Sequence, residues 1–129
     1  MVDTTVLIDD SDIDLFIQRR FLEVYHFSKK QISYKSAEEA LAWLSALNGE
    51  LPPDVIFLDL NMPNVDGFQF LESFKNLSQK IRDKSRIVVL TSSNSQKDRD
   101  LAFSYKNVIQ FVTKPLKQSD IEDLKKIVI

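Results

Sequence analysis

The hydrophobic and polar positions of this chain alternate between two patterns. Short, uninterrupted apolar runs are typical of strands buried on both faces of a parallel sheet, whereas apolar residues at helical spacing indicate amphipathic helices. The two patterns follow one another along the whole sequence. We therefore expect five strands, three of them at the apolar runs Thr5–Ile8, Val55–Leu58 and Ile87–Leu90 and two at the mixed segments Ile32–Tyr34 and Val108–Val112.

The segments between these runs predict five helices. Ser11 is placed to cap the first of them. The expected buried face of this helix consists of Ile13, Phe16, Ile17, Phe21 and Val24. The other helices are expected after Ser36–Glu39, after Asp66-Gly67, from Ser95 to Ser104, and from Ser119–Glu122 to the region of Val128. The polar segment Asn76–Ser85 indicates either a longer third helix or an enlarged loop.

Strands that alternate with helices favour right-handed crossovers and a parallel sheet covered by helices on both faces. The expected fold class is α/β, a three-layer α/β/α arrangement with a doubly wound five-stranded parallel sheet in the flavodoxin-like order 2-1-3-4-5. A chain of 129 residues suits one domain with a single core. In such sheets, function gathers at the carboxyl ends of the strands.

Composition narrows the classes of protein. The formal net charge of −2 argues against a nucleic-acid footprint, which requires a clustered basic excess. The absence of cysteine excludes disulfides and thiolate metal sites. Residues Met1–Thr5 have no basic segment, and their apolar run is too short for a signal peptide or a membrane span. We expect a cytoplasmic protein that contacts neither free nucleic acid nor a membrane.

Acidic residues follow two of the predicted strands. Asp9 and Asp10 come after the first apolar run, and Asp59 comes after the third. Carboxylates held about 4 Å apart repel by about 4 kcal/mol per pair at an effective dielectric of about 20, so a fold rarely gathers them without a counter-ion. This pattern favours a divalent cation. Taken alone, Asp9-Asp10-Ser11 also fits the start of a helix, where the dipole favours acidic residues.

Two further strand ends carry polar side chains. Thr91 and Ser92 follow the fourth strand, and Lys114 precedes Pro115 after the fifth. Individually, Thr91 is also explained as a β-branched strand residue and Lys114 as a solvated charge. Their coincidence with the three acids predicts one crevice that contains carboxylates, a hydroxyl and an ammonium group.

Four motifs, each at the end of a predicted strand, resemble the receiver domain of two-component response regulators, the CheY-like superfamily. They are Leu7–Asp10, Leu58–Gly67, Val89–Ser92 and Phe111–Pro115. The resemblance covers nearly the whole chain, so residues 1–129 are expected to form a single receiver domain.

The resemblance implies a phosphoacceptor and a metal site. Asp59 would accept the phosphoryl group. Asp10, Asp59 and the backbone carbonyl of Asn61 would bind Mg²⁺ directly, with Mn²⁺ as an alternative ion, and Asp9 would hold the ion through water. The donor set agrees with the oxygen-only coordination that Mg²⁺ prefers.

Thr91 and Lys114 would complete this site. In the family, a cis peptide bond commonly precedes the proline and aims the lysine inward, and Lys114-Pro115 is the candidate bond here. Phe111 would be the switch aromatic, which turns as Thr91 moves toward the phosphoryl group. The remodelled surface would consist of the fourth predicted helix, the fifth strand and the last helix.

The implied function is a response regulator of phosphorelay signal transduction. A sensor histidine kinase or a histidine phosphotransfer protein would donate the phosphoryl group, and the receiver would catalyse only its own phosphorylation and dephosphorylation. A downstream protein target would recognise the remodelled surface. We expect a monomer or a weak phosphorylation-dependent dimer, and the chain is either a single-domain regulator or a receiver excised from a longer protein.

Two features depart from the common family pattern. The chain has Ser104–Asn107 where many receivers carry a Gly-Ala pair before the fifth strand, so we expect Asn107 to adopt the left-handed conformation. Phe111 lacks the hydroxyl group of a tyrosine, so packing alone would hold its inward state. Asn61 and Ser93 occupy the positions that commonly tune dephosphorylation.

Three alternatives belong to other classes. A flavin carrier would share the topology, but the acidic Asp9 and Asp10 would repel its phosphate group. An aspartyl-phosphate phosphatase would usually place its nucleophile after the first strand, with a second aspartate two residues on, where this chain has Ser11. A phosphorylation-independent scaffold, a pseudo-receiver, is the strongest alternative, although such chains usually lack one of the acidic, hydroxyl or lysine positions.

Overall fold

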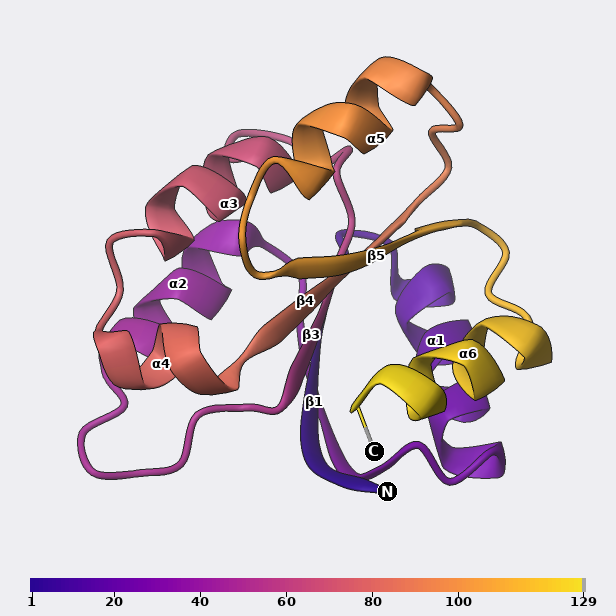
Figure 1. Ribbon diagram of the computed structural model, residues 1–129, viewed down its shortest axis with the longest axis horizontal. Coiled ribbons are helices and arrows are strands. Elements are labelled where there is room, and N and C mark those ends of the chain that lie inside the picture. Colours follow the sequence, from indigo (N-terminus) through magenta and orange to yellow (C-terminus); the bar gives the residue numbers. More distant parts are fainter. Residues whose placement is uncertain (129) are drawn as a thin grey trace.

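The computed structural model describes residues 1–128, and strands alternate with helices along this chain (Figure 1). The strands are β1 (Val2–Ile8), β2 (Ser28–Tyr34), β3 (Val55–Leu58), β4 (Arg86–Thr91) and β5 (Val108–Thr113). The helices are α1 (Asp12–Val24), α2 (Ala37–Ser45), α3 (Gly67–Phe74), α4 (Gln79–Lys84), α5 (Gln96–Phe103) and α6 (Gln118–Val128).

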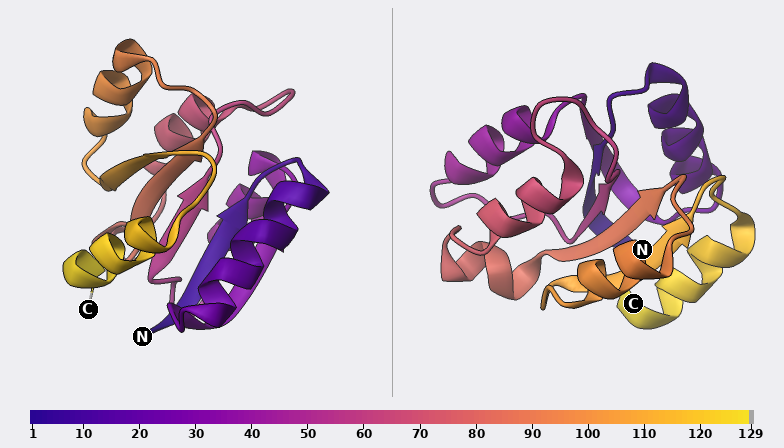
Figure 2. Two further views of the ribbon diagram at one scale, coloured as in Figure 1. Left: turned by 90° about the vertical axis from the view of Figure 1, so that its right-hand side faces the viewer. Right: turned by 90° about the horizontal axis from the view of Figure 1, so that it is seen from above.

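All five strands are parallel, in the order β2-β1-β3-β4-β5. The helices α1 and α6 lie on one face of the sheet, and α2 to α5 lie on the other, so the sheet is sandwiched between two helical layers (Figure 2). The predicted three-layer fold and strand order are therefore confirmed.

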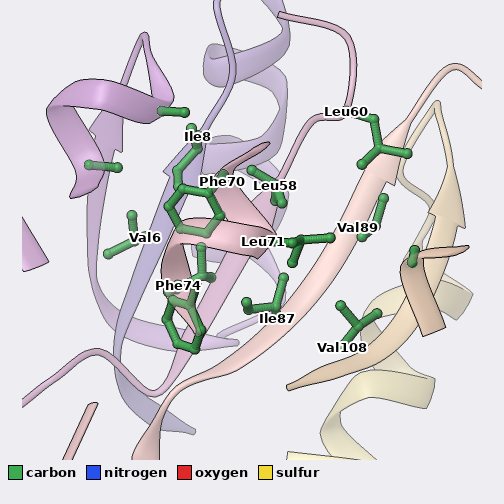
Figure 3. Close-up of a cluster of buried hydrophobic side chains, with 14 of the residues drawn as sticks. Val6, Ile8, Leu58, Leu60, Phe70, Leu71, Phe74, Ile87, Val89 and Val108 are labelled. Carbon is green, nitrogen blue, oxygen red and sulfur yellow. The ribbon is translucent and has the colours of Figure 1, made fainter. Parts of the chain in front are cut away.

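The central strand β3 joins the two halves of the core. All four of its residues are buried, and they alternate between the faces. Leu58 lies with Phe70 of α3 in one cluster (Figure 3), to which Ile56 also belongs. Phe57 packs on the opposite face, with its ring centroid 5.9 Å from that of Phe27. This burial on both faces explains why the strand is a continuous apolar run.

The expectation of five helices was wrong, because the polar segment after α3 contains the short additional helix α4. Its one buried residue is Ile81, at 4% exposure, and the side chain of Arg82 donates a hydrogen bond of 2.9 Å to the carbonyl of Leu77. Too few apolar positions are present for sequence periodicity to detect such a helix.

The predicted buried face of α1 was also wrong. Ser11 does cap the helix, because its hydroxyl accepts a 3.2 Å hydrogen bond from the amide of Asp14. The residues that face the sheet, however, are Leu15, Gln18 and Leu22, while Phe16 is 70% exposed. The helix carries apolar residues on more than one face, and docking on the sheet selects the face that includes a glutamine.

Two local expectations were also wrong. The last helix begins at Gln118, one residue before the predicted cap, and the carboxylate of Asp120 accepts a hydrogen bond from the amide of Lys117. The turn before β5 does not place Asn107 in the left-handed region. The side chain of Asn107 stabilises this turn by donating hydrogen bonds to the carbonyls of Arg82 and Ser85, at 2.7 and 2.8 Å.

Within residues 1–128, every helix is too short or too polar to cross a membrane.

Candidate functional site

The three acidic residues that follow β1 and β3 lie together at the carboxyl edge of the sheet. One carboxylate oxygen from each of Asp9, Asp10 and Asp59 lies within 4.8 Å of the others. Adjacent strands create this arrangement, because the amide of Asp59 donates to the carbonyl of Ile8 at 3.0 Å. Asp9 and Asp59 are buried, at 1% and 6% exposure, whereas Asp10 is exposed.

Lys114 brings a positive charge to these acids from the end of β5. Its amide donates a 2.7 Å hydrogen bond to the carbonyl of Thr91, which fixes the end of β5 beside the end of β4. Its Nζ atom lies 2.8 Å from Oδ2 of Asp9 and 3.8 Å from Oδ2 of Asp59. The peptide bond between Lys114 and Pro115 is cis.

Sequence reasoning missed two residues at this site, both on α1. Asp14 accepts a second 2.8 Å hydrogen bond from Nζ of Lys114, and Gln18 donates from Nε2 to Oδ2 of Asp9 at 3.1 Å. Gln18 is buried, at 4% exposure. The sequence shows a glutamine and an aspartate within a predicted helix, but it does not tell which side of this helix faces the sheet.

The electrostatics of the site follow from burial and mutual repulsion. Burial raises the pKa of Asp59 to about 6; the ammonium group of Lys114 opposes this rise, and the charges of Asp9 and Asp10 add to it. Burial alone would lower the pKa of Lys114, but its hydrogen bonds to Asp14 and Asp9 and the charge of Asp59 outweigh that effect and raise it. The lysine is therefore a permanent cation in this site.

Thr91 is fully buried at the end of β4, beside the acidic cluster. Its Oγ1 atom accepts hydrogen bonds from the side-chain amide of Asn61 and the backbone amide of Ser93, both at 3.3 Å. Ser93 in turn donates to Asp98 of α5 at 2.7 Å. These contacts link the loop after β3, the end of β4 and α5 through the hydroxyl groups of Thr91 and Ser93.

Phe111 lies on β5, and its ring is buried at 7% exposure. The guanidinium of Arg99 in α5 sits 5.8 Å from the centroid of this ring and 5.2 Å from that of Phe103. The aromatic ring is therefore covered in this structure, with an exposed arginine over it as a cation–π partner.

The loop between β3 and α3 is held close to the acidic strand end. Asp66 caps α3 in a reciprocal capping box with Gln69, in which both hydrogen bonds are present at 2.8 and 2.9 Å. Gly67 follows, and a Cβ atom there would lie 2.6 Å from Cα of Leu60 and 2.7 Å from the carbonyl oxygen of Asp59. Only glycine permits this close approach without movement of the backbone.

The donor set of the cluster fits a hard divalent cation. Three carboxylates converge with oxygen atoms alone, and the charges of Asp9 and Asp10 add to the rise in the pKa of Asp59 that burial causes. Asp10 is open to solvent and leaves room for the water ligands that Mg²⁺ usually keeps.

The parallel α/β sheet and the group of Asp9, Asp10, Asp59, Thr91 and Lys114 at its carboxyl edge define a CheY-like protein. The chain belongs to the response regulator receiver domain family, whose sequence model matches residues 5–126. The family expected from the four motifs is thus confirmed.

Solved structures of similar sequence share this fold. A two-component response regulator from Cytophaga hutchinsonii is 30% identical, with a TM-score of 0.90 and coverage of 98% of this chain and 96% of that one. A response regulator receiver protein from Dyadobacter fermentans is 29% identical, with a TM-score of 0.87 and coverage of 98% and 97%.

Curated relatives differ widely in length. The chain is 32% identical over 126 residues to the probable methanogenesis regulatory protein FilR2 of Methanothrix harundinacea, covering 95% of this chain and 77% of that protein. It is 26% identical over 121 residues to the hybrid signal transduction histidine kinase L of Dictyostelium discoideum, covering 94% of this chain but 7% of the kinase.

Proposed function

We propose that this chain is a phosphorylation-dependent receiver of two-component signal transduction, with Asp59 as the phosphoacceptor. The observation that carries the proposal is the environment of Asp59. Its carboxylate is nearly buried at a strand end, two further carboxylates converge on it, and the ammonium group of Lys114 lies 3.8 Å away. An oxygen nucleophile flanked by a cation and a metal-binding set is suited to phosphoryl transfer.

The proposed reaction moves one phosphoryl group between two proteins. An oxygen of Asp59 attacks the phosphorus of a phosphohistidine, the phosphorus–nitrogen bond breaks, and the imidazole keeps the electron pair of that bond. The product is an acyl phosphate on Asp59. Water later attacks this phosphorus and restores the carboxylate with release of inorganic phosphate. The chain thus catalyses only its own phosphorylation and dephosphorylation.

The acidic cluster would hold Mg²⁺, with Mn²⁺ as an alternative ion. Asp10, Asp59 and the backbone carbonyl of Asn61 would bind the ion directly, and Asp9 would contact it through water. When bound, the ion neutralises the carboxylates and the charge on the phosphoryl oxygens. Lys114 supplies the remaining point charge on the other side of Asp59.

Phosphorylation would act as a switch because it adds a dianionic group beside Thr91 and Lys114. The hydroxyl of Thr91 now accepts from Asn61 and Ser93, so it is free to donate its own proton to a phosphoryl oxygen. Movement of Thr91 would shift Ser93 and, through Asp98, the helix α5. We propose that Phe111 and the surface of α5, β5 and α6 respond to this shift.

The phosphodonor would be a sensor histidine kinase or a histidine phosphotransfer protein, and the output would be a protein target that binds the surface of α5, β5 and α6. We propose that residues 1–129 act as one receiver domain in the cytoplasm, without direct contact with nucleic acid or membrane, as a monomer or a weak phosphorylation-dependent dimer. The sole histidine, His26, is exposed and follows the end of α1, and is assigned no role in the transfer.

Heteronuclear NMR with beryllofluoride, a phosphoryl mimic, tests this proposal. In the presence of Mg²⁺, the signals of Thr91 and Phe111 should shift on addition of beryllofluoride, and Asp59→Asn should abolish the shift. Asp12→Asn is a matched control, because Asp12 is an exposed acid in the first turn of α1 that pairs with Lys35 instead. An unchanged response in Asp59→Asn would contradict the assignment.

A further inference from the structure

Lys114 does not make its shortest contacts with the proposed phosphoacceptor. Its Nζ atom lies 2.8 Å from Oδ2 of Asp9 and 2.8 Å from Oδ2 of Asp14, but 3.8 Å from Oδ2 of Asp59. The first two distances are those of charge-assisted hydrogen bonds, and the third is an ion pair without one. In the unmodified protein, Lys114 therefore donates a hydrogen bond to Asp14 but none to Asp59.

The two partners of Lys114 differ in how they are held. Asp9 is almost completely buried, and its carboxylate also accepts from the backbone amide of Ser11 and from the side chain of Gln18. Asp14 lies in the first turn of α1, where its side chain is 37% exposed, and Lys114 is its one side-chain hydrogen-bond partner among the described residues. The contact with Asp14 is therefore the one that can be given up at small cost.

The surroundings leave room for such a change. A cavity of about 230 Å³ lies between α1 and the segment after β5, and its lining includes Asp14, Gln18 and Lys114. Because Asp14 lines this opening, water can solvate its carboxylate once the lysine has left.

A phosphoryl group on Asp59 would compete for the same proton donor. It is dianionic, whereas Asp14 is a single, partly solvated carboxylate, so the lysine gains more from the phosphoryl oxygens. The free energy of the Lys114–Asp14 contact, however, stabilises only the unmodified protein. A contact present in only one of two states shifts the equilibrium toward that state.

We propose that Asp14 is a positioning residue that holds Lys114 away from Asp59 in the unmodified protein and so weakens the binding of a phosphoryl group. This inference rests on the proposed phosphoacceptor role of Asp59 and adds a regulatory contact from α1. Asp14 competes with the phosphoryl group for the position of the ammonium group of Lys114.

Beryllofluoride affinity at saturating Mg²⁺ tests the inference by comparing Asp14→Asn with the wild type. The variant should bind beryllofluoride about fivefold more tightly, which is the size expected for losing a partly exposed ion pair. Asp14→Glu should restore the wild-type affinity. Asp12→Asn removes the same charge from the same helix turn but contacts Lys35, so it should leave the affinity unchanged.

Three results would overturn the inference: unchanged affinity in Asp14→Asn, weaker binding, or an equal gain in Asp12→Asn. The last would indicate a general charge effect. A wild type that binds no beryllofluoride would instead refute the proposed function. A crystal structure of unmodified Asp14→Asn still tests the inference in that case: Nζ of Lys114 should approach Asp59 to hydrogen-bonding distance, and an unchanged separation would contradict it.

Discussion

The ammonium nitrogen of Lys114 lies 3.8 Å from Oδ2 of Asp59, although the two residues are more than fifty positions apart in the sequence. The parallel pairing of β3, β4 and β5 brings them together, and the hydrogen bond from Lys114 to the carbonyl of Thr91 fixes the distance between their strands. Lys114 is thus the cation that partly offsets the repulsion between the three clustered carboxylates.

The raised pKa of Asp59 predicts a pH-dependent stability of the metal-free protein. The pKa is about 6 in the folded chain and near its usual value of 3.8 when unfolded, so the folded state binds more protons between these values. Stability should therefore be highest below pH 4 with respect to this group, and should fall as the pH rises through 6. The difference corresponds to about 3 kcal/mol at most.

Asp59→Asn should remove the pH-dependent loss of stability that the raised pKa of Asp59 causes. In the presence of a chelator, urea unfolding should show the variant to be more stable than the wild type at pH 7.5, with the difference shrinking toward pH 4. Lys114, Asp9, Asp10 and Asp14 remain in both proteins, so their common contributions largely cancel. A wild type and variant with parallel stability curves would show that the pKa of Asp59 is not raised.

Removal of a divalent cation should destabilise the wild-type protein at neutral pH. Mg²⁺ at a hundredfold excess over its dissociation constant should add about 2.7 kcal/mol to the free energy of unfolding. Thermal melts with increasing Mg²⁺ measure this effect. Asp10→Asn and Asp59→Asn should each reduce the Mg²⁺-dependent rise, whereas Asp12→Asn should retain it. An equal rise in all four proteins would place the ion elsewhere.

Gly67→Ala should destabilise the protein because a Cβ atom at this position would overlap the backbone of Asp59 and Leu60. The expected loss is about 1–3 kcal/mol, as for other overpacked sites, and urea unfolding measures it. Gly49→Asn is a suitable control: Gly49 has φ 84°, which asparagine tolerates better than most residues, and a Cβ atom added there would meet no other atom within 4 Å. Gly49→Asn should lower the free energy of unfolding clearly less than Gly67→Ala does. An equal loss in the two variants would contradict the close approach at Gly67.

The buried face of α1 predicts that two of its apolar residues contribute very differently to the free energy of unfolding. Leu22 is fully buried, so Leu22→Ala should cost about 2–5 kcal/mol in the free energy of unfolding. Phe16 is 70% exposed, so Phe16→Ala should change stability by less than about 0.5 kcal/mol. Chemical denaturation measures both. A larger loss of stability in Phe16→Ala than in Leu22→Ala would show that the helix face predicted from the sequence is the buried one.

The order of strands could be predicted because strands that alternate with helices are typical of a doubly wound parallel sheet. The convergence of Asp9, Asp10 and Asp59 could be predicted because these residues directly follow apolar strands whose carboxyl ends meet at one edge. The contact of Asp14 with Lys114 could not. It depends on which side of α1 faces the sheet, and the apolar residues Ile13 and Phe16 indicated the wrong side.

Short polar elements were the second source of error. The helix α4 contributes only Ile81 to the core, so it leaves almost no hydrophobic period in the sequence. The turn before β5 was expected to need a left-handed Asn107, but side-chain hydrogen bonds to Arg82 and Ser85 hold it in place. Both features depend on contacts with distant segments, which local patterns do not encode.

The most direct test of the central claim is the mass of the intact protein after incubation with acetyl phosphate and Mg²⁺. We predict one added phosphoryl group that is lost on alkaline treatment, as expected of an acyl phosphate, and no adduct on Asp59→Asn under the same conditions. A wild type that gains no adduct from any phosphodonor, or an equally modified Asp59→Asn, would contradict the claim.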